Sequence, residues 1–245
     1  MDLSVVIPAY NEAQRLPTTL SELEAYFAPQ ARAVEVIVVD DGSQDATATL
    51  PLPADRPGRL LWRRLQNAGN RGKGYSVRRG MLEARGELCL FTDADLAAPI
   101  AELAKLEQAL RSTGAAVAIG SRRRRDLIRQ HQSVFRENAG RIFNRMVRWS
   151  LGLRFVDTQC GFKLFTAASA AAIFAQQRVE GWGFDPELLF LARRLGYRVE
   201  EVPVVWSHVE GAKIRMASDS LAMFQDIMRI RRLHPSPRRP SAPPR

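Results

Sequence analysis

The stretch Leu3-Ser4-Val5-Val6-Ile7-Pro8-Ala9-Tyr10-Asn11-Glu12 opens with an apolar run of strand length and ends in polar residues. Four more short, mostly apolar runs follow it, at residues 34–39, 60–65, 88–92 and 117–119. Helix-length segments of mixed polarity separate them, at residues 12–27, just after Asp45, and at residues 74–84 and 100–112. This alternation predicts an α/β fold in which helices cover both faces of a Rossmann-like, mostly parallel sheet.

Polar residues follow four of the predicted strands. They are Pro8-Ala9-Tyr10-Asn11-Glu12, Asp40-Asp41-Gly42-Ser43, Asp93-Ala94-Asp95 and Gly120-Ser121-Arg122. Any one of these segments could be only a turn or a helix cap. Open parallel sheets bind ligands at the carboxyl ends of their strands, so the joint placement of these polar segments favours a binding site.

Asp93 and Asp95 stand one residue apart at a strand end. Paired carboxylates suit a hard divalent cation, Mg²⁺ or Mn²⁺, whose other ligands are phosphate oxygens of a substrate. The Tyr10 ring and the Asp41 carboxylate could hold a base and a ribose. The glycine-rich segment 67–74 could bring Lys73 to a phosphate, or it could be a plain loop before a helix. Neither the dinucleotide-binding fingerprint nor the P-loop motif occurs in the sequence.

The formal net charge of +10 is concentrated in two segments. Residues 122–148 hold nine arginines and two acidic residues, and residues 229–245 hold six arginines and no acid. Nucleic acid, an anionic membrane surface and a phosphorylated substrate compete as partners for such local patches. Nucleic acid is disfavoured because Asp41, Asp93 and Asp95 would repel it.

Composition and motifs favour a cytoplasmic location. The chain has two cysteines without disulfide or zinc spacing, and its first residues do not resemble a signal peptide. No run of apolar residues is long enough to suggest a membrane span. Residues 234–245 are rich in proline and arginine, and we predict that they form a disordered basic tail.

The sequence resembles the family 2 glycosyltransferases, and within them the dolichyl-phosphate β-glucosyltransferases and their bacterial polyprenyl-phosphate relatives. The matching motifs occur in the family's order. They are Val5-Val6-Ile7-Pro8-Ala9-Tyr10-Asn11-Glu12, Val38-Val39-Asp40-Asp41-Gly42-Ser43, Asn70-Arg71-Gly72-Lys73-Gly74, Thr92-Asp93-Ala94-Asp95-Leu96, Gly120-Ser121-Arg122, Asp157-Thr158-Gln159-Cys160-Gly161-Phe162-Lys163-Leu164-Phe165, Phe184-Asp185-Pro186-Glu187-Leu188-Leu189 and Trp206-Ser207-His208-Val209-Glu210-Gly211-Ala212-Lys213. The early motifs indicate only the family, whereas the run from Asp157 is more specific to transfer onto a lipid phosphate. The resemblance implies the A-type glycosyltransferase (GT-A) fold.

The resemblance also implies roles for individual residues. The nucleoside would be held by Pro8, Tyr10, Glu12, Val39 and Asp41. The metal would be held by the Asp93-Ala94-Asp95 motif, with Asp95 as the nearest ligand. Arg122 would meet the phosphates, Arg136 would bind the acceptor phosphate, and Lys213 would close over the diphosphate. The acceptor side would include Asp157, Gln159 and Asp185.

Together these features predict a metal-dependent transferase that moves a hexose, glucose in the first instance, from UDP to a polyprenyl phosphate of the dolichyl or undecaprenyl type. The family resemblance alone implies that the transfer is inverting. Related mannosyl enzymes carry glutamine and arginine where this chain has Ala97 and Ser207, which disfavours GDP-mannose as donor. A same-fold enzyme that acts on a saccharide hydroxyl, or one that uses GDP-mannose, remains the alternative. For a hydroxyl acceptor, Asp185 is the better candidate base.

Two amphipathic segments indicate how the protein could reach a lipid substrate. Residues 141–151 and 218–233 place apolar side chains on one helical face with arginines beside them. They could lie at the inner face of the cytoplasmic membrane as interfacial helices, or they could be ordinary core helices. The predicted organisation is one glycosyltransferase domain over residues 1–233, with a nucleotide-sugar half (1–122) and an acceptor half (123–233).

Overall fold

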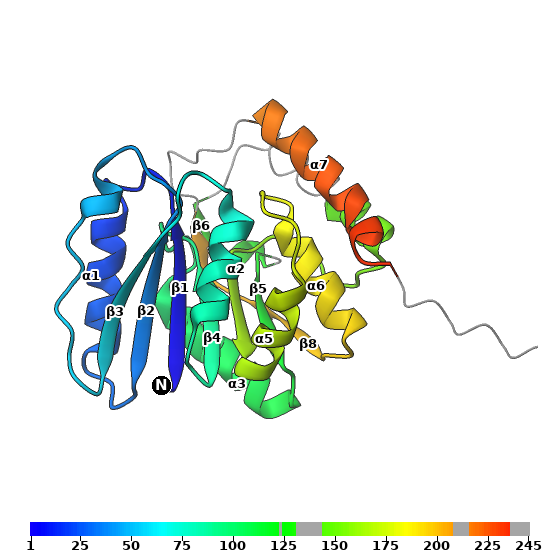
Figure 1. Ribbon diagram of the computed structural model, residues 1–245. Coiled ribbons are helices and arrows are strands. Elements are labelled where there is room, and N and C mark those ends of the chain that lie inside the picture. Colours follow the sequence, from blue (N-terminus) through cyan, green and yellow to red (C-terminus); the bar gives the residue numbers. More distant parts are fainter. Residues whose placement is uncertain (123, 131–143, 208–215, 236–245) are drawn as a thin grey trace, which may run out of the picture.

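The computed structural model describes residues 1–122, 124–130, 144–207 and 216–235. Its centre is a seven-stranded sheet with the strand order β3-β2-β1-β4-β7-β5-β8 (Figure 1). These strands are β1 (Leu3–Ala9), β2 (Val34–Asp40), β3 (Leu60–Gln66), β4 (Leu88–Thr92), β5 (Val117–Ser121), β7 (Phe162–Thr166) and β8 (Val199–Pro203). A two-stranded sheet pairs β6 (Ile128–Gln130) with β9 (Trp206–Ser207). The strands predicted from the first half of the sequence are confirmed.

Helices cover both faces of the central sheet. They are α1 (Leu16–Phe27), α2 (Lys73–Glu83), α3 (Leu103–Thr113), α5 (Ala167–Gln176), α6 (Phe184–Arg194), α7 (Met216–Leu233) and a helix over residues 144–151, with short 3₁₀ segments at Ala46–Thr49, Ile100–Glu102 and Arg125–Leu127. Successive side chains of a strand point to opposite faces. Val5 and Ile7 of β1 therefore pack with α1 and α3, whereas Val6 packs with α2, α5 and α6. The predicted mostly parallel α/β class is confirmed.

Strands β6 to β9 of the described chain were not anticipated from the sequence, and β7 is the one that shapes the site. β7 is antiparallel to its neighbours and lies between β4 and β5, which therefore do not pair with each other. Because β7 runs in the opposite direction, it begins at the edge where the parallel strands end. Its first residue, Phe162, pairs with Thr92, the last residue of β4. The segment before β7 is thus brought directly against the residues that follow β4.

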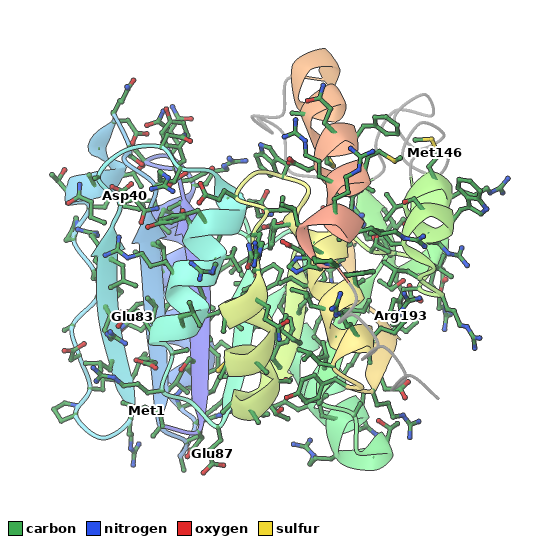
Figure 2. The ribbon with its side chains drawn as sticks, turned by 45° about the vertical axis from the view of Figure 1, so that its right-hand side comes forward. Met1, Asp40, Glu83, Glu87, Met146 and Arg193 are labelled. Atoms are coloured by element: carbon green, nitrogen blue, oxygen red, sulfur yellow. The ribbon has the colours of Figure 1, made fainter. Side chains whose placement is uncertain are left out.

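Helix 144–151 and α7 bury one face and expose the other. Val147 and Ile227 are buried in the same apolar cluster. On their outer faces, Trp149 is 87% exposed and Met228 is 52% exposed. Met146 lies at the same end of the molecule as Asp40 at the carboxyl end of β2, and opposite Met1 (Figure 2). No helix in the described ranges combines the length and the apolar character that crossing a bilayer requires.

The start of the predicted tail needs a correction. His234 is buried rather than disordered, and its Nε2 lies 2.6 Å from Oε1 of Glu187, which is fully buried in α6. The backbone carbonyls of His234 and Pro235 also accept hydrogen bonds from the Arg194 guanidinium. The end of α7 is therefore fastened to α6. Residues 236–245 of the predicted tail lie outside the described residues.

Candidate active site

Asp93 and Asp95 follow β4 on a short turn at the carboxyl edge of the sheet. Leu96 has a φ of 44°, a conformation that non-glycine residues seldom adopt, and the turn is held by a bond from the Ala97 backbone N–H to Asp95 Oδ1 at 3.1 Å. Thr19 Oγ1 donates to the Ala94 carbonyl at 2.6 Å. The strained turn and its two bonds keep both carboxylates at the strand end.

This carboxylate pair fits a divalent cation. Burial raises the pKa of Asp95, and the nearby negative charge of Asp93 raises it further. A bound cation would relieve that repulsion. The described residues contain no cluster of three or more histidine, cysteine, aspartate or glutamate side chains suited to a metal. Asp93 and Asp95 therefore match the mode in which Mg²⁺ takes one or two carboxylates and completes its shell with water and substrate phosphates.

The Lys73 ammonium already contacts this pair. Lys73 is the first residue of α2, and its Nζ lies 2.5 Å from Asp93 Oδ1. Burial opposes the charged ammonium, but the carboxylates of Asp93 and Asp185 outweigh it, so the pKa of Lys73 is raised. Gly72 enables this placement, because its φ is 106° and a Cβ there would lie 2.5 Å from the Glu180 carbonyl oxygen.

Asp41 fixes the loop that carries Lys73. Its Oδ1 accepts from Asn67 Nδ2 at 2.7 Å and from the Arg71 backbone N–H at 3.0 Å, and its Oδ2 accepts from the Gly72 backbone N–H at 2.8 Å. The carboxylate is 3% exposed. The structure thus shows Asp41 ordering the glycine-rich loop, while its nucleoside-binding role stays a prediction.

The other predicted nucleoside residues lie along the ends of β1 and β2. The Val39 side chain is fully buried against α2, so only its main chain could reach a ligand. Pro8 and Tyr10 are half-buried. Glu12 forms a two-point pair with Arg15, with both N···O distances 2.7 Å. Arg15 was missed in the sequence, although its place three residues after Glu12 is a recognisable pairing distance.

Arg15 links this region to the metal site. Its Nη1 lies 3.8 Å from Asp95 Oδ2. Since Arg15 touches both Glu12 and Asp95, it connects the end of β1 to the end of β4. Arg15 therefore lies between the predicted nucleoside residues and the predicted metal site.

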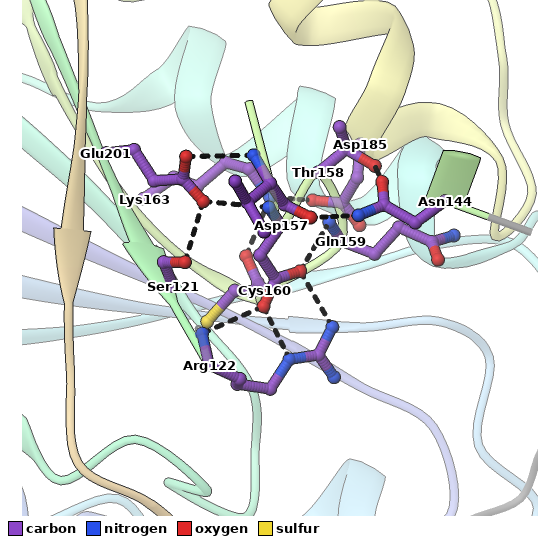
Figure 3. Close-up of polar contacts among 11 residues, drawn as sticks. Ser121, Arg122, Asn144, Asp157, Thr158, Gln159, Cys160, Lys163, Asp185 and Glu201 are labelled. Carbon is purple, nitrogen blue, oxygen red and sulfur yellow. Dashed lines mark hydrogen bonds and ion pairs between the residues drawn. The ribbon is translucent and has the colours of Figure 1, made fainter. Parts of the chain in front are cut away.

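Arg122 and Asp157 form a tight pair at the end of β5 (Figure 3). The Arg122 Nε and Nη2 donate to the two Asp157 oxygens at 2.7 and 2.8 Å, and the Arg122 backbone N–H donates at 3.0 Å. Burial alone would raise the pKa of Asp157, but the Arg122 guanidinium reverses this and lowers it to about 2. The guanidinium also lies 5.5 Å from the centre of the Trp206 ring. The two predicted residues are therefore brought together.

The segment from Asp157 to β7 packs directly on the metal site. A Cβ at Gly161 would lie 2.2 Å from Asp93 Oδ2, so any other residue here would require the Asp93 carboxylate to move. Gln159 Nε2 donates to Met223 Sδ in α7 at 2.8 Å. Burial raises the pKa of the neighbouring Cys160 thiol to about 12, so this thiol stays neutral. The predicted acceptor motif and the predicted metal motif thus share one edge of the sheet.

Asp185 is less accessible than the sequence suggested. Its Oδ1 is paired with Lys163 Nζ, and Lys163 has no exposed surface. Lys163 Nζ also donates to the Cys160 carbonyl at 2.6 Å. Burial raises the pKa of Asp185, against the opposing charge of Lys163. Lys163 was not singled out in the sequence, because a lysine inside an apolar strand gives no sign that it is buried and paired.

Two predicted site residues, Arg136 and Lys213, lie outside the described residues. The remaining predicted residues surround the carboxyl edge of the sheet, with Asp93, Asp95, Lys73 and Arg122 as its charged centre. Arg122 is close enough to Asp93 for their charges to interact. This edge brings together two carboxylates that suit a metal and two cations that suit phosphates.

Comparison with known proteins agrees with this geometry. The family model described as glycosyl transferase family 2 matches residues 4–171. The chain is 42% identical to dolichyl-phosphate beta-glucosyltransferase of Drosophila melanogaster over 94% of this chain and 74% of that protein. It is 37% identical to dolichyl-phosphate beta-glucosyltransferase of Homo sapiens over 94% of this chain and 74% of that protein.

Solved structures share the fold. Glucosyl-3-phosphoglycerate synthase from Mycobacterium tuberculosis, solved with Mg²⁺ and UDP, aligns with a TM-score of 0.65 and 18% identity over 94% of this chain and 79% of that one. Mannosyl-3-phosphoglycerate synthase from Rubrobacter xylanophilus aligns with a TM-score of 0.69 and 18% identity over 99% of this chain and 79% of that one. The predicted GT-A fold is confirmed. The chain therefore belongs to glycosyl transferase family 2 and is a glycosyltransferase.

Proposed function

We propose that this enzyme transfers glucose from UDP-glucose to a polyprenyl phosphate, with inversion at the transferred carbon and with Mg²⁺ or Mn²⁺ bound at Asp93 and Asp95. The relatives named as dolichyl-phosphate beta-glucosyltransferases support the sugar and the acceptor class. The fold neighbour solved with Mg²⁺ and UDP supports the donor nucleotide and the metal. The observation that carries the proposal is the contact of the Asp157–Gly161 segment with Asp93.

Neither of the two acidic residues predicted for the acceptor side, Asp157 and Asp185, is available as a general base. The Asp157 carboxylate is occupied by Arg122, and Asp185 is sealed against Lys163. A saccharide hydroxyl would need such a base. A phosphate monoester has its second pKa near 6, so at neutral pH it is largely a dianion and attacks without losing a proton. The geometry therefore favours a phosphate acceptor over a hydroxyl acceptor.

The difficulty for a phosphate acceptor is electrostatic. Two like unit charges about 5 Å apart repel by roughly 3 kcal/mol at an effective dielectric of about 20. Lys73 and Arg122 supply positive charge at the edge where acceptor and diphosphate would meet. When bound at Asp93 and Asp95, the divalent ion would neutralise the departing diphosphate. These cations offset the repulsion that would otherwise slow the reaction.

We also propose peripheral binding at the cytoplasmic face of the membrane, and exposed apolar side chains support binding to a membrane surface. Trp149 is 87% exposed, Met228 is 52% exposed, and Phe224 is 39% exposed. Arg145 and Arg229 are exposed on the same helices. Apolar groups flanked by arginine are typical of helices that lie in the headgroup region of an anionic bilayer. This surface would present the site to a lipid-linked acceptor.

Transfer of radiolabelled glucose from UDP-glucose to undecaprenyl phosphate in anionic vesicles tests the proposal. We expect Asp95→Asn to lower kcat by about a thousandfold or more, because a lost metal ligand removes several kcal/mol of charge stabilisation. Asp2→Asn is the matched control: Asp2 lies at the opposite end of the sheet, bonded to the Ala33 backbone N–H. Its activity should match the wild type.

Three results would contradict this proposal. Transfer to a simple saccharide, with none to undecaprenyl phosphate, would favour the hydroxyl-acceptor alternative. Turnover with GDP-mannose in place of UDP-glucose would contradict the donor. Full activity of Asp95→Asn would remove Asp95 from the metal site.

A further inference from the structure

Glu201 makes three hydrogen bonds at the acceptor side of the site. It lies on β8, and its Oε1 accepts from Ser121 Oγ at 2.7 Å and from the Asp157 backbone N–H at 2.8 Å. Its Oε2 accepts from the Val156 backbone N–H at 2.9 Å. Figure 3 shows this carboxylate spanning β5 and the segment that carries Asp157. Neither the sequence motifs nor the family resemblance pointed to it.

The bonds of Glu201 continue to Arg122 through Asp157. Glu201 holds the main chain of Asp157, and the Asp157 carboxylate holds two nitrogens on one edge of the Arg122 guanidinium. Ser121, the third donor to Glu201, directly precedes Arg122 on β5. Glu201 therefore bonds the Ser121 side chain on the Arg122 side of the pair and the main chain of Val156 and Asp157 on the other side.

This arrangement leaves one guanidinium nitrogen for a ligand. In the described part of the chain, Nη1 of Arg122 makes no hydrogen bond, whereas Nε and Nη2 are both taken by Asp157. The Arg122 side chain is 32% exposed. Since a guanidinium is planar and its donors point in fixed directions, the Asp157 contact sets where Nη1 points. An anion that approaches Arg122 meets a donor whose direction is already determined.

We propose that Glu201 is a positioning residue that aims Arg122 at the phosphate of the acceptor. The inference rests on the proposed function, since it takes the acceptor to be a phosphate monoester. The acceptor phosphate is assigned here, rather than the donor diphosphate, because Asp157 belongs to the segment that leads into β7 and not to the Asp93–Asp95 turn, and Glu201 bonds that segment from β8. Groups that contact a ligand need their positions held to within about 0.5 Å, and residues that hydrogen-bond to them from behind hold them there. Glu201 is such a residue for the Arg122–Asp157 pair.

The test is equilibrium binding of geranyl phosphate, measured by calorimetry without donor. Glu201→Gln keeps the size of the side chain but replaces one accepting oxygen by an NH₂ group, which opposes a backbone N–H. We expect the Kd for geranyl phosphate to rise about tenfold, a loss comparable to that of one charge-assisted hydrogen bond. The Kd for UDP with Mg²⁺ should change less than about twofold, because the Asp93–Asp95 turn is not touched.

Two further variants separate positioning from a merely structural role. Ser121→Ala removes one donor and leaves the carboxylate, so it should raise the Kd for geranyl phosphate by about twofold to threefold. Arg122→Lys cannot reproduce the two-point contact, so adding Glu201→Gln to it should raise the Kd by less than about twofold more. A tenfold effect that persists in the Arg122→Lys background would overturn the proposal, because Glu201 would not act through Arg122.

The remaining outcomes are also decisive. Equal weakening of geranyl phosphate and UDP binding, with a lower Tm, would assign Glu201 a structural role. A wild-type protein that does not bind geranyl phosphate would overturn the proposal. Arg122-dependent binding without glucose transfer would leave the positioning role supported and would contradict the proposed function instead.

Discussion

Two lysine–aspartate pairs lie at the same edge of the sheet and differ in how far solvent reaches them. In the Lys73–Asp93 pair the side chains are 15% and 32% exposed. In the Lys163–Asp185 pair they are 0% and 6% exposed. Lys73 is also close enough to Asp185 for their charges to interact. The four side chains thus form one row of alternating charges. We call Lys73–Asp93 the open pair, because solvent reaches it, and Lys163–Asp185 the sealed pair, because it is buried.

The difference in exposure indicates that one pair can bind ligands and that the other holds the fold together. An accessible carboxylate can exchange its lysine for a metal ion, and the released lysine can then contact a phosphate. Lys163 has no such freedom, because it also bonds the Cys160 carbonyl and lies 5.3 Å from the centre of the Phe91 ring. It fastens β7 to α6 and so fixes the segment that reaches Asp93. We therefore expect the sealed pair to govern stability and the open pair to govern ligand affinity.

The largest effect should come from breaking the sealed pair. Lys163→Met leaves the buried Asp185 carboxylate without its cation, and we expect the free energy of unfolding to fall by about 3–5 kcal/mol. Urea denaturation at neutral pH measures this. Lys105→Met is the matched control: Lys105 is 44% exposed and pairs with Glu102, so its loss should cost less than about 1 kcal/mol.

A double variant sharpens this test. Lys163→Met with Asp185→Leu removes both charges, so most of the lost stability should return, because an apolar pair of similar volume replaces a buried ion pair at little cost. If the Lys163→Met protein is as stable as the Lys105→Met protein, the sealed pair does not govern stability and the comparison fails.

The Arg122–Asp157 pair provides an intermediate case that pH can probe. The pKa of Asp157 is lowered to about 2 in the folded protein, below its value of about 3.9 in an unfolded chain. Its ionised form therefore stabilises the fold above pH 4, by about 2 kcal/mol, and this contribution is lost as pH falls from about 4 toward 2.

The matched variant for this effect is Asp157→Asn, which has no carboxylate to titrate. The difference in unfolding free energy between wild type and variant should be largest at pH 5 and should shrink as the pH falls toward 3. Urea titrations at a series of pH values measure it. A difference that stays constant over this range would show that the pair does not stabilise the ionised form of Asp157.

The sequence predicted the surroundings of the open pair, Lys73–Asp93, better than those of the sealed pair, Lys163–Asp185. Alternating apolar and mixed segments predicted the parallel strands, and polar residues after those strands predicted Asp93, Asp95 and Arg122 as neighbours. β7 was missed because Lys163 interrupts its apolar pattern, and a lysine in a five-residue strand looks like a surface residue. The contacts of Lys73 and Glu201, and that of Arg15 with Asp95, join distant segments, so residue spacing carries little information about them.

The smallest predicted effect concerns the open pair: removing the Lys73 charge should strengthen the binding of a metal ion and not weaken it. Without nucleotide, the Lys73 ammonium occupies Asp93 and repels a divalent cation. Lys73→Met should therefore tighten Mn²⁺ binding by about threefold to tenfold, a change of about 1 kcal/mol. With UDP present the sign should reverse, because Lys73 then contributes its charge to the diphosphate and its loss weakens binding.

Calorimetric titration of Mn²⁺ with and without UDP measures both arms, and Lys73→Arg serves as control because it keeps the positive charge. The arginine variant should not tighten Mn²⁺ binding in the absence of UDP. If Lys73→Met weakens Mn²⁺ binding in both titrations, Lys73 supports the site instead of competing for it. The open pair would then resemble the sealed one, since in both the lysine would hold a carboxylate in place, and exposure alone would not distinguish a ligand-binding cation from a structural one.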